Sequence, residues 1–228
     1  MLQHRLSSIT YFSPSRYDSP VLICRSIGIR QLGIIKRTFV IRDKNSLLTL
    51  YKSTVRPILE YGSPVWNPWK QKDIDKIERV QRRFTRLVEG CKGLTYIERL
   101  KKLNLPSLYF RRRRERIIQV YKIMHNLYDS DSSGFFKLSN KQSTRGHKWK
   151  LQAAASRLAL RSNFLTVNTI HDWNSLSEDV VSAKTLNSFK SRLAAYLQQD
   201  QFLTRDREGA NYNHNPSYDL ASTSSRLI

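Results

Sequence analysis

The spacing of hydrophobic residues along the chain predicts a protein made mainly of α-helices. The clearest segment runs from 72 to 89, where apolar residues recur at steps of three and four, as they do on one face of a helix. Gly90 follows, at the place of a C-cap glycine. The apolar positions of this helix are Ile74, Ile77, Val80, Phe84, Leu87 and Val88.

The chain upstream of this helix shows a second helical pattern and then a turn. Asp43 or Ser46 can cap a helix that Pro57 is expected to kink or to end early. Trp66 and Trp69 are expected to anchor the following turn on the core. The helix carries Leu47, Leu50, Tyr51, Thr54, Val55 and Ile58, and the turn is marked by Gly62, Pro64 and Pro68.

Downstream, the pattern predicts three more helices. A short one is expected over 95–102, and Ser107 can cap a long one that reaches about 127. Thr185 can cap a last helix with the stripe Leu186, Phe189, Leu193 and Leu197. We therefore expect a helical bundle with disordered termini and with irregular or short extended segments around 128–170, near Trp149 and Leu158. The expected parts are an unassigned lead-in that is disordered or unrelated (1–30), a helical domain (31–127), a loop (128–146), a C-terminal extension (147–200) and a disordered tail (201–228).

Composition adds a strong positive charge to this helical pattern. The 228 residues include 40 Lys and Arg against 18 Asp and Glu, a net charge of +22, while 39% hydrophobic residues are enough for a core. Such a charge favours a polyanionic partner, with nucleic acid first and an anionic membrane surface second. No apolar run is long enough for a transmembrane helix or a signal peptide. Cys24 and Cys91 suit a reducing compartment, nuclear or cytoplasmic rather than secreted.

The positive charge is concentrated between 70 and 116, in two groups that are candidates for nucleic-acid binding. The first is a row at helical spacing on the 72–89 helix, about one charge per turn, which could follow a phosphate backbone. The alternative is a solvated helix with salt bridges to Asp73, Asp75 and Glu78. The candidates in this group are Lys72, Lys76, Arg79, Arg82, Arg83 and Arg86.

The second group is an arginine run whose members point all the way round a helix. Arg113 and Arg114 flank its apolar face, so they must extend to solvent, pair with a buried acid or meet an external phosphate. A nuclear-localisation signal is another interpretation. The candidates are Arg111, Arg112, Arg113, Arg114 and Arg116.

No residues point to catalysis, a cofactor or a metal. The acid pairs are Asp73/Asp75, Asp129/Asp131 and Glu178/Asp179, and none lies in the strand–turn–strand context that fixes two Mg²⁺ ions. The histidines are scattered singly, and His171 beside Asp172 is expected to be a surface histidine. We expect no enzyme activity and no cofactor from this chain on its own.

Six strings in order along the chain carry a resemblance to a known family. They are LGIIKRTF (32–39), LYKSTVRPILEYGSPVWNP (50–68), DIDKIERVQRRFTRLVEG (73–90), GLTYIERLKKLNLPSLYFRRRRERIIQVYKIMHNL (93–127), STRGHKWKL (143–151) and NFLTVNTIHDWNSLSEDVVSAKTLNSFKSRL (163–193). This set resembles the region downstream of the polymerase palm in LINE-type, jockey-like non-LTR retrotransposon reverse transcriptases.

The resemblance implies that 31–127 is a thumb-like domain that holds an RNA–DNA hybrid or duplex. The family's catalytic aspartates, which bind Mg²⁺ in the intact enzyme, have no counterpart here, so the resemblance implies a non-catalytic part of an RNA-directed DNA polymerase. Ser177 stands where the family pattern has proline. Three alternatives remain open: a working enzyme, a protein-interaction or assembly module that uses its basic faces, and a decayed element copy that is not expressed.

Overall fold

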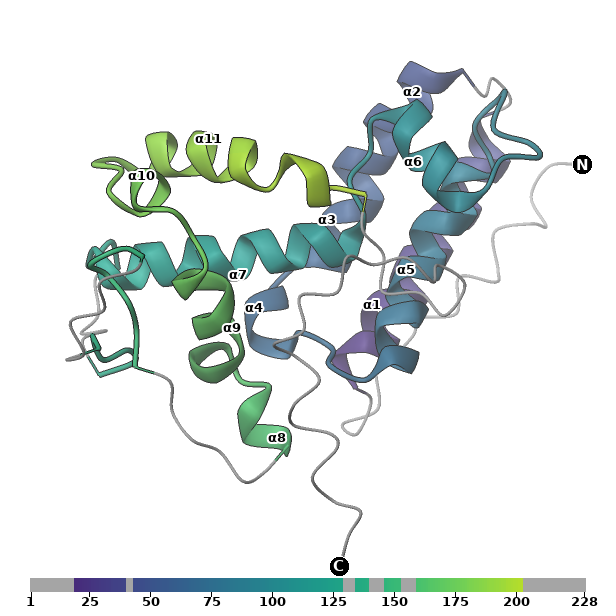
Figure 1. Cartoon of the computed structure of the whole chain (residues 1–228). Helices are drawn as coiled ribbons and strands as arrows, with labels where there is room; N and C mark the ends of the chain where they lie inside the picture. Colours follow the sequence, from purple (N-terminus) through teal and green to yellow (C-terminus); the bar gives the residue numbers. More distant parts are fainter. Residues whose placement is uncertain (1–18, 40–42, 129–133, 140–145, 153–158, 203–228) are drawn as a thin grey trace, which may run out of the picture. The chain divides into compact units, whose positions relative to one another are not determined.

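The computed structural model describes residues 19–39, 43–128, 134–139, 146–152 and 159–202, and these are mainly helical (Figure 1). This confirms the fold class that the hydrophobic spacing predicts. The only strand-like pairing among the described residues is an isolated antiparallel bridge between Leu138 and Leu151. The chain divides into an N-terminal unit, Met1–Arg99, and a C-terminal unit, Leu100–Ile228.

The N-terminal unit is a set of helices around a core to which α1 and α5 both contribute. Their packing brings α1 against α3 and α5. The elements are α1 (Pro20–Thr38), α2 (Lys44–Leu50), the π-helical turn η1 (Tyr51–Val55), α3 (Arg56–Glu60), α4 (Ser63–Trp66), α5 (Gln71–Thr85) and α6 (Tyr96–Leu103), within which the division between the units falls.

Helix α1 is not predicted from the sequence, because residues 1–30 show no clear hydrophobic period. Pro20 occupies the first turn, where a missing backbone N–H costs nothing. The buried face of the helix carries Val21, Gly28, Leu32 and Ile35, while Leu22 and Ile34 are exposed. A glycine in the buried stripe and apolar residues outside it hide the helical period. Residues 1–18 lie outside the described residues.

Pro57 does not end the second helical segment at once, because α3 continues through it to Glu60. A π-helical turn precedes the proline, and the N–H of Arg56 donates to the carbonyl of Tyr51, five residues back. The hydroxyls of Ser53 and Thr54 donate to the carbonyl of Leu50, which satisfies an acceptor near the change of register. Asp43 caps the segment by accepting from the N–H of Ser46 at 2.9 Å, as expected.

The structure corrects two expectations in the segment around α5. The helix ends at Thr85, before Leu87 and Val88, and Gly90 adopts its positive φ of 71° in the following turn instead of at the C-cap. Of the two tryptophans expected as anchors, Trp66 is half-buried and donates to the carbonyl of Tyr61 at 2.7 Å. Trp69 is 39% exposed and anchors nothing.

The C-terminal unit is built on the long helix α7. The expected domain over 31–127 grouped this helix with the preceding helices, whereas the structure places it in the unit that begins at Leu100. Helix α7 packs against α9 and α11. Ser107 caps α7 and Thr185 caps α11, both as expected. The elements are α7 (Leu108–Met124), α8 (Ala159–Ser162), α9 (Leu165–Asn174), α10 (Glu178–Val181), α11 (Leu186–Tyr196) and the 3₁₀ turn η2 (Gln198–Asp200).

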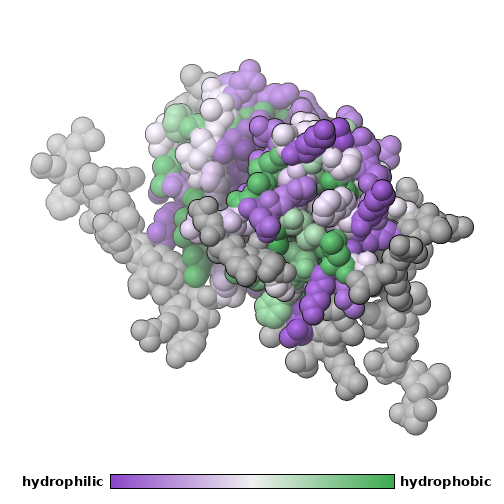
Figure 2. All heavy atoms as spheres, turned by 90° about the vertical axis from the view of Figure 1, so that its left-hand side faces the viewer, coloured by the Kyte–Doolittle hydropathy of each residue, from purple (hydrophilic) through white to green (hydrophobic). Residues whose placement is uncertain are grey.

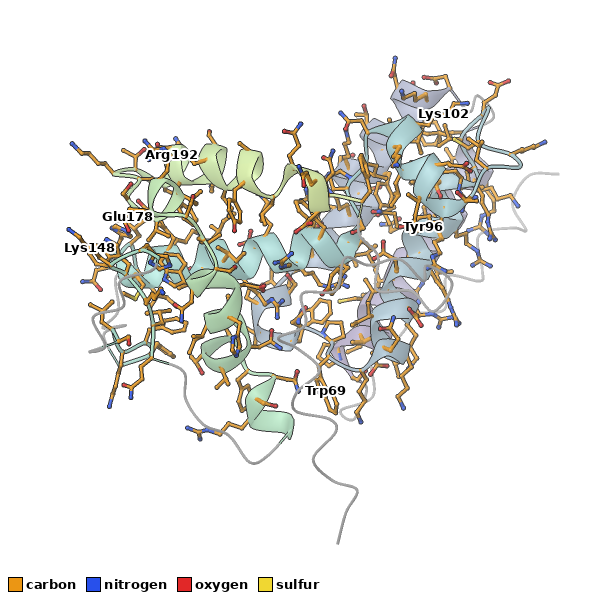
Figure 3. The ribbon with its side chains drawn as sticks, viewed as in Figure 1. Trp69, Tyr96, Lys102, Lys148, Glu178 and Arg192 are labelled. Carbon is orange, nitrogen blue, oxygen red and sulfur yellow. The ribbon has the colours of Figure 1, made fainter. Side chains whose placement is uncertain are left out.

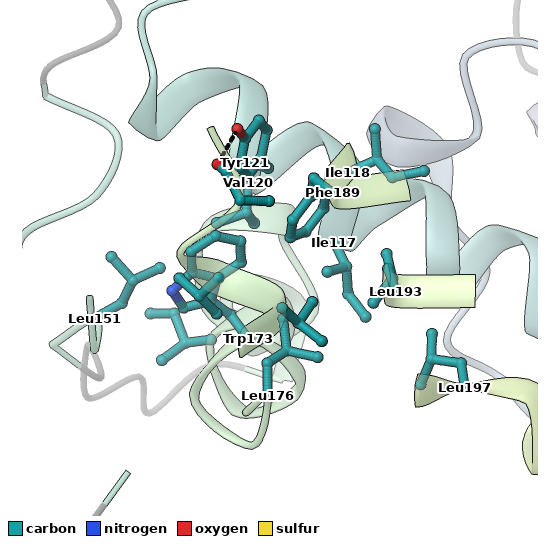
Figure 4. Packing of buried hydrophobic residues seen from close by; sticks show 14 of the residues in the cluster. Ile117, Ile118, Val120, Tyr121, Leu151, Trp173, Leu176, Phe189, Leu193 and Leu197 are labelled. Carbon is teal, nitrogen blue, oxygen red and sulfur yellow. Dashed lines mark hydrogen bonds between the residues drawn. The ribbon is translucent and has the colours of Figure 1, made fainter. Parts of the chain in front are cut away.

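The core of the C-terminal unit forms between these helices. Trp173 of α9, Tyr121 of α7 and Phe189 of α11 are almost completely buried, and the hydroxyl of Tyr121 donates to the carbonyl of Ala183 at 2.7 Å (Figure 4). Leu151 joins this core from the bridged segment. The extended structure expected near Trp149 is limited to the single bridge at Leu151, and the chain from 159 onward forms the helices α8 and α9 instead. Leu158 and the tail from 203 onward lie outside the described residues.

We predict opposite effects for leucine at two glycines of α1. A Cβ at Gly28 would lie 2.9 Å from Leu59 Cδ2 and 3.3 Å from Val80 Cγ1, whereas nothing lies within 4 Å of a Cβ at Gly33. Gly28→Leu should destabilise by about 1–3 kcal/mol through overpacking. Gly33→Leu should stabilise by about 0.5 kcal/mol, because leucine favours helix more than glycine does. Urea unfolding followed by circular dichroism measures both, and equal shifts would contradict the close approach at Gly28.

Candidate nucleic-acid interface

Helix α5 has one face in the core of the N-terminal unit, which fixes the direction of its other side chains. Ile74, Ile77, Val80 and Phe84 are at most 3% exposed. Tyr51 stacks on the ring of Phe84, with centroids 4.1 Å apart. Because this apolar face is held, the basic residues between its positions are directed to solvent or to the neighbouring α6.

Four of the basic residues on α5 and its C-cap are exposed. We call Lys72, Arg79, Arg83 and Arg86 the α5 cationic surface. Within the described part of the chain, none of these four takes part in an ion pair. Lys76, the fifth member of the expected row, is half-buried, and its Nζ lies 2.8 Å from Asp73 Oδ1. The salt-bridge alternative therefore applies to Lys76.

The acids of α5 have partners away from the α5 cationic surface. Asp73 pairs with Lys76, and Asp75 accepts from Gln71 Nε2 at 2.8 Å. Glu78 is only 2% exposed and accepts from the hydroxyl of Tyr96 at 2.6 Å. Burial, and then the Glu78 carboxylate, hold the pKa of Tyr96 well above its usual range. The local excess of cations on the exposed face is therefore not cancelled by the helix's own acids.

A further group of cations gathers where α6 meets the end of α5. The guanidinium of Arg82 lies over the ring of Tyr96, 4.9 Å from its centroid, and that of Arg99 lies 5.8 Å from the same centroid. Arg99 is buried, and its Nε donates to Thr85 Oγ1 at 3.0 Å. Burial and then the nearby charge of Arg86 lower the pKa of Arg99.

The positive charge gathered at the C-terminal end of α5 is larger than the negative end of the helix dipole can compensate. The C-terminus of a helix carries roughly half a negative charge, whereas Arg82, Arg86 and Arg99 bring three full positive charges to it. An external anion would relieve their mutual repulsion. Sequence reasoning missed Arg99 and Tyr96. The signal was there, because Tyr96, Arg99 and Leu103 follow at steps of three and four and so place an arginine on the apolar line of α6.

Two arginines of the run on α7 are buried, so these two do not face an external phosphate in this structure, and the other three are half-buried. Arg112 and Arg116 are 2% and 7% exposed. Arg111 and Arg114 are half-buried, and Arg114 donates to the carbonyl of Lys190 at 3.3 Å. Burial and then the charge of Arg111 lower the pKa of Arg114. These arginines contact other helices of the unit, and the arginine run alone does not predict which helices pack against it.

Arg113 meets a buried acid, one of the three fates expected for it. Its Nε lies 3.0 Å from Asp172 Oδ1, and its Nη1 lies 2.9 Å from Asp200 Oδ2. Burial lowers the pKa of Arg113, but the two carboxylates outweigh burial and raise it. Arg116 reaches the same acid at 3.8 Å and donates to Asn168 Oδ1 at 2.7 Å. Asp172 thus joins α7 to α9.

The remaining acids do not assemble into a metal site in the described part of the chain. No group of three or more His, Cys, Asp or Glu side chains there is arranged to hold a metal ion. Asp129 and Asp131 lie outside the described residues. His171 is on the exposed face of α9, as expected. Among the described helices, none is both long and apolar enough to cross a bilayer.

Comparison with known proteins identifies no relative. No family model, no curated protein and no solved structure matches the chain. The described part of the chain defines only a class of protein. It is a helical protein in which one face of α5 carries exposed cations without ion pairs to other described residues.

We predict that Asp172 contributes much more to stability than a matched surface aspartate. Asp172 is buried between Arg113 and Arg116, so Asp172→Ala leaves their charges uncompensated and should cost about 3–5 kcal/mol. Asp179 pairs with Arg192 at 3.1 Å, but its side chain is 78% exposed, and Asp179→Ala should cost no more than about 1 kcal/mol. Denaturant midpoints compare the two variants, and similar losses would contradict the structural role of Asp172.

Proposed function

We propose that the chain binds an RNA–DNA hybrid or duplex through the α5 cationic surface, without sequence preference and without chemistry of its own. The observation that carries this proposal is the row of exposed cations at Lys72, Arg79, Arg83 and Arg86, which form no ion pair with any other described residue. Side chains that contact phosphates position a protein on nucleic acid but carry no sequence information.

The length of the α5 cationic surface suits a phosphate backbone. From Lys72 to Arg86 a helix rises about 21 Å, at about 1.5 Å per residue. Duplex DNA carries a negative charge for about every 1.7 Å of its axis, so roughly a dozen phosphates lie along this span. Each of the four cations therefore has phosphates within reach, and the Arg82, Arg86 and Arg99 group adds a point of high positive potential at one end.

The resemblance to LINE-type reverse transcriptases supports a particular origin for this role. In such a polymerase the region after the palm would hold the primer–template. Helix α5 lies within the string from 73 to 90 that carries part of the resemblance. We infer that the chain corresponds to this non-catalytic gripping region, with α5 as the helix that faces the duplex.

Replacing the α5 cationic surface tests the binding. The variant Lys72→Ala, Arg79→Ala, Arg83→Ala and Arg86→Ala should bind a 20-base-pair RNA–DNA hybrid more weakly, because up to four phosphate contacts are lost. The slope of log K against log salt should become shallower by up to about 3.6, that is 0.9 for each contact. Fluorescence anisotropy of the labelled hybrid at several salt concentrations measures both.

A control variant separates the α5 cationic surface from net charge. Lys36, Lys44, Lys52 and Lys101 are exposed elsewhere in the sequence, and replacing all four by alanine removes the same charge. This control should retain most of the affinity and of the salt slope. If it weakens binding as much as the α5 variant, the interaction is general attraction to a basic protein and the proposal fails.

Primer extension tests the absence of chemistry. With poly(rA) template, oligo(dT) primer and Mg²⁺, the purified chain should give no extended product, because no described group of acids converges to bind metal. An active reverse transcriptase in the same buffer is the positive control. Extension that disappears on addition of EDTA and persists through repurification would contradict a purely binding role.

A further inference from the structure

The C-terminal unit contains a column of aromatic rings that runs from its core to its surface. Phe189 stacks on Tyr121, and Tyr121 stacks on His125, each pair with centroids 4.1 Å apart. His125 in turn lies 5.8 Å from Trp149, at an interplanar angle of 34°. Phe189 and Tyr121 are at most 1% exposed, whereas Trp149 is 38% exposed. The column therefore ends in a large ring that reaches solvent.

The backbone around Trp149 is held on both sides by α9 and its flanking residues. The carbonyl of Trp149 accepts from Trp173 Nε1 at 2.8 Å. The N–H and carbonyl of Leu151 both bond to the side chain of Asn174, at 2.8 and 2.9 Å. The ring of the buried His147 lies 3.0 Å from the carbonyl of Trp173. Trp149 is therefore presented by a fixed segment, which lowers the entropy cost of binding.

Three lysines lie on the segment that carries the exposed tryptophan and on the segment bridged to it. Lys148 and Lys150 are its neighbours in sequence, and Lys137 lies across the bridge, where its carbonyl accepts from the N–H of Gln152 at 2.8 Å. Residues 134–139 and 146–152 contain these three lysines and no acid. Figure 3 shows Lys148 at the outer edge of this unit, near Glu178, whose carboxylate accepts from the Lys148 backbone N–H at 3.0 Å.

Exposed apolar side chains lie among these lysines. Phe135 and Leu138 are 57% and 46% exposed, on the segment bridged to the one that carries Trp149. Figure 2 looks toward the side of this unit that carries α10, and it shows hydrophobic side chains interspersed with hydrophilic ones. Burial lowers the pKa of His125, so its imidazole is neutral at neutral pH and adds no charge to the column.

We propose that Trp149 is a stacking site for an unpaired base of a single-stranded nucleic acid, with Lys137, Lys148 and Lys150 holding the adjacent phosphates. An aromatic ring flanked by cations is the arrangement with which proteins bind single strands without sequence preference. A duplex does not offer the face of a base within its length. A protein partner is a poorer match, because lysine is depleted in the buried centres of protein interfaces. The site does not depend on the α5 cationic surface.

Trp149→Leu in the full chain tests the proposal. It keeps the backbone hydrogen bonds of the segment but removes the ring. Its affinity for a labelled 20-nucleotide oligo(dT) strand should fall about tenfold, and its affinity for a duplex of the same length should stay within about twofold of wild type. Trp149→Phe should recover most of the single-strand affinity. Circular dichroism melting shows that each variant is folded.

Trp69→Leu is the control for loss of an equally exposed tryptophan, because Trp69 is 39% exposed but stands outside the aromatic column and outside the two bridged segments. It should leave single-strand affinity unchanged. Equal losses from the Trp69 and Trp149 variants would overturn the proposal, as would wild-type single-strand binding by Trp149→Leu. If the Trp149 variant instead abolishes self-association seen by sedimentation while oligonucleotide binding persists, the surface is a protein interface. The test of the α5 cationic surface is separate from this one, because it measures the affinity for a duplex and the salt dependence of that affinity.

Discussion

The shortage of carboxylates is the constraint on which the described structure depends. With 18 acids for 40 basic residues, most cations cannot find a partner within the chain. Some arginines are therefore buried beside one of the few acids, while Arg99 is buried with a hydroxyl and a backbone carbonyl as partners. Asp172 is the clearest case, since one buried carboxylate faces both Arg113 and Arg116 and joins α7 to α9. A buried guanidinium without such compensation costs several kcal/mol.

The same constraint explains why α5 and α7 differ in spite of similar basic sequences. On α7 the acids come from other elements of the same unit, Asp172 on α9 and Asp200 on η2, and they pair with Arg113 and Arg116. On α5 the acids are local and are engaged by Lys76, Gln71 and Tyr96. The outward cations of α5 are left to repel one another. That repulsion is the free energy an incoming phosphate backbone would release, and it supports the proposed interface better than charge density alone does.

Sequence reasoning succeeded where one periodic signal decided the structure. The apolar steps of α5 and α11, and the caps at Asp43, Ser107 and Thr185, required no knowledge of neighbours, because helix faces and caps are local. It failed where the structure depends on a contact between residues far apart in the sequence. Gly28 in the middle of α1 interrupts the apolar pattern, yet it is the place where α1 comes closest to Leu59 and Val80. The burial of Arg112 and the partners of Arg113 likewise depend on residues far along the chain.

Trp149 and its neighbouring lysines show that the role of an aromatic residue among cations cannot be inferred from the sequence until the backbone around it is known. In the sequence it is one of four tryptophans, in a segment whose pattern did not choose between helix and strand. In the structure, Trp149 lies in a turn and is 38% exposed, whereas Leu151 at the bridge joins the core, and Asn174 and Trp173 hold the segment by its backbone groups. A large apolar ring on a fixed backbone is costly to leave in water, since the segment cannot rearrange to bury it. The proposed ligand, a nucleotide in a single strand, suits such a ring because it is flat, apolar on its faces and negatively charged beside them.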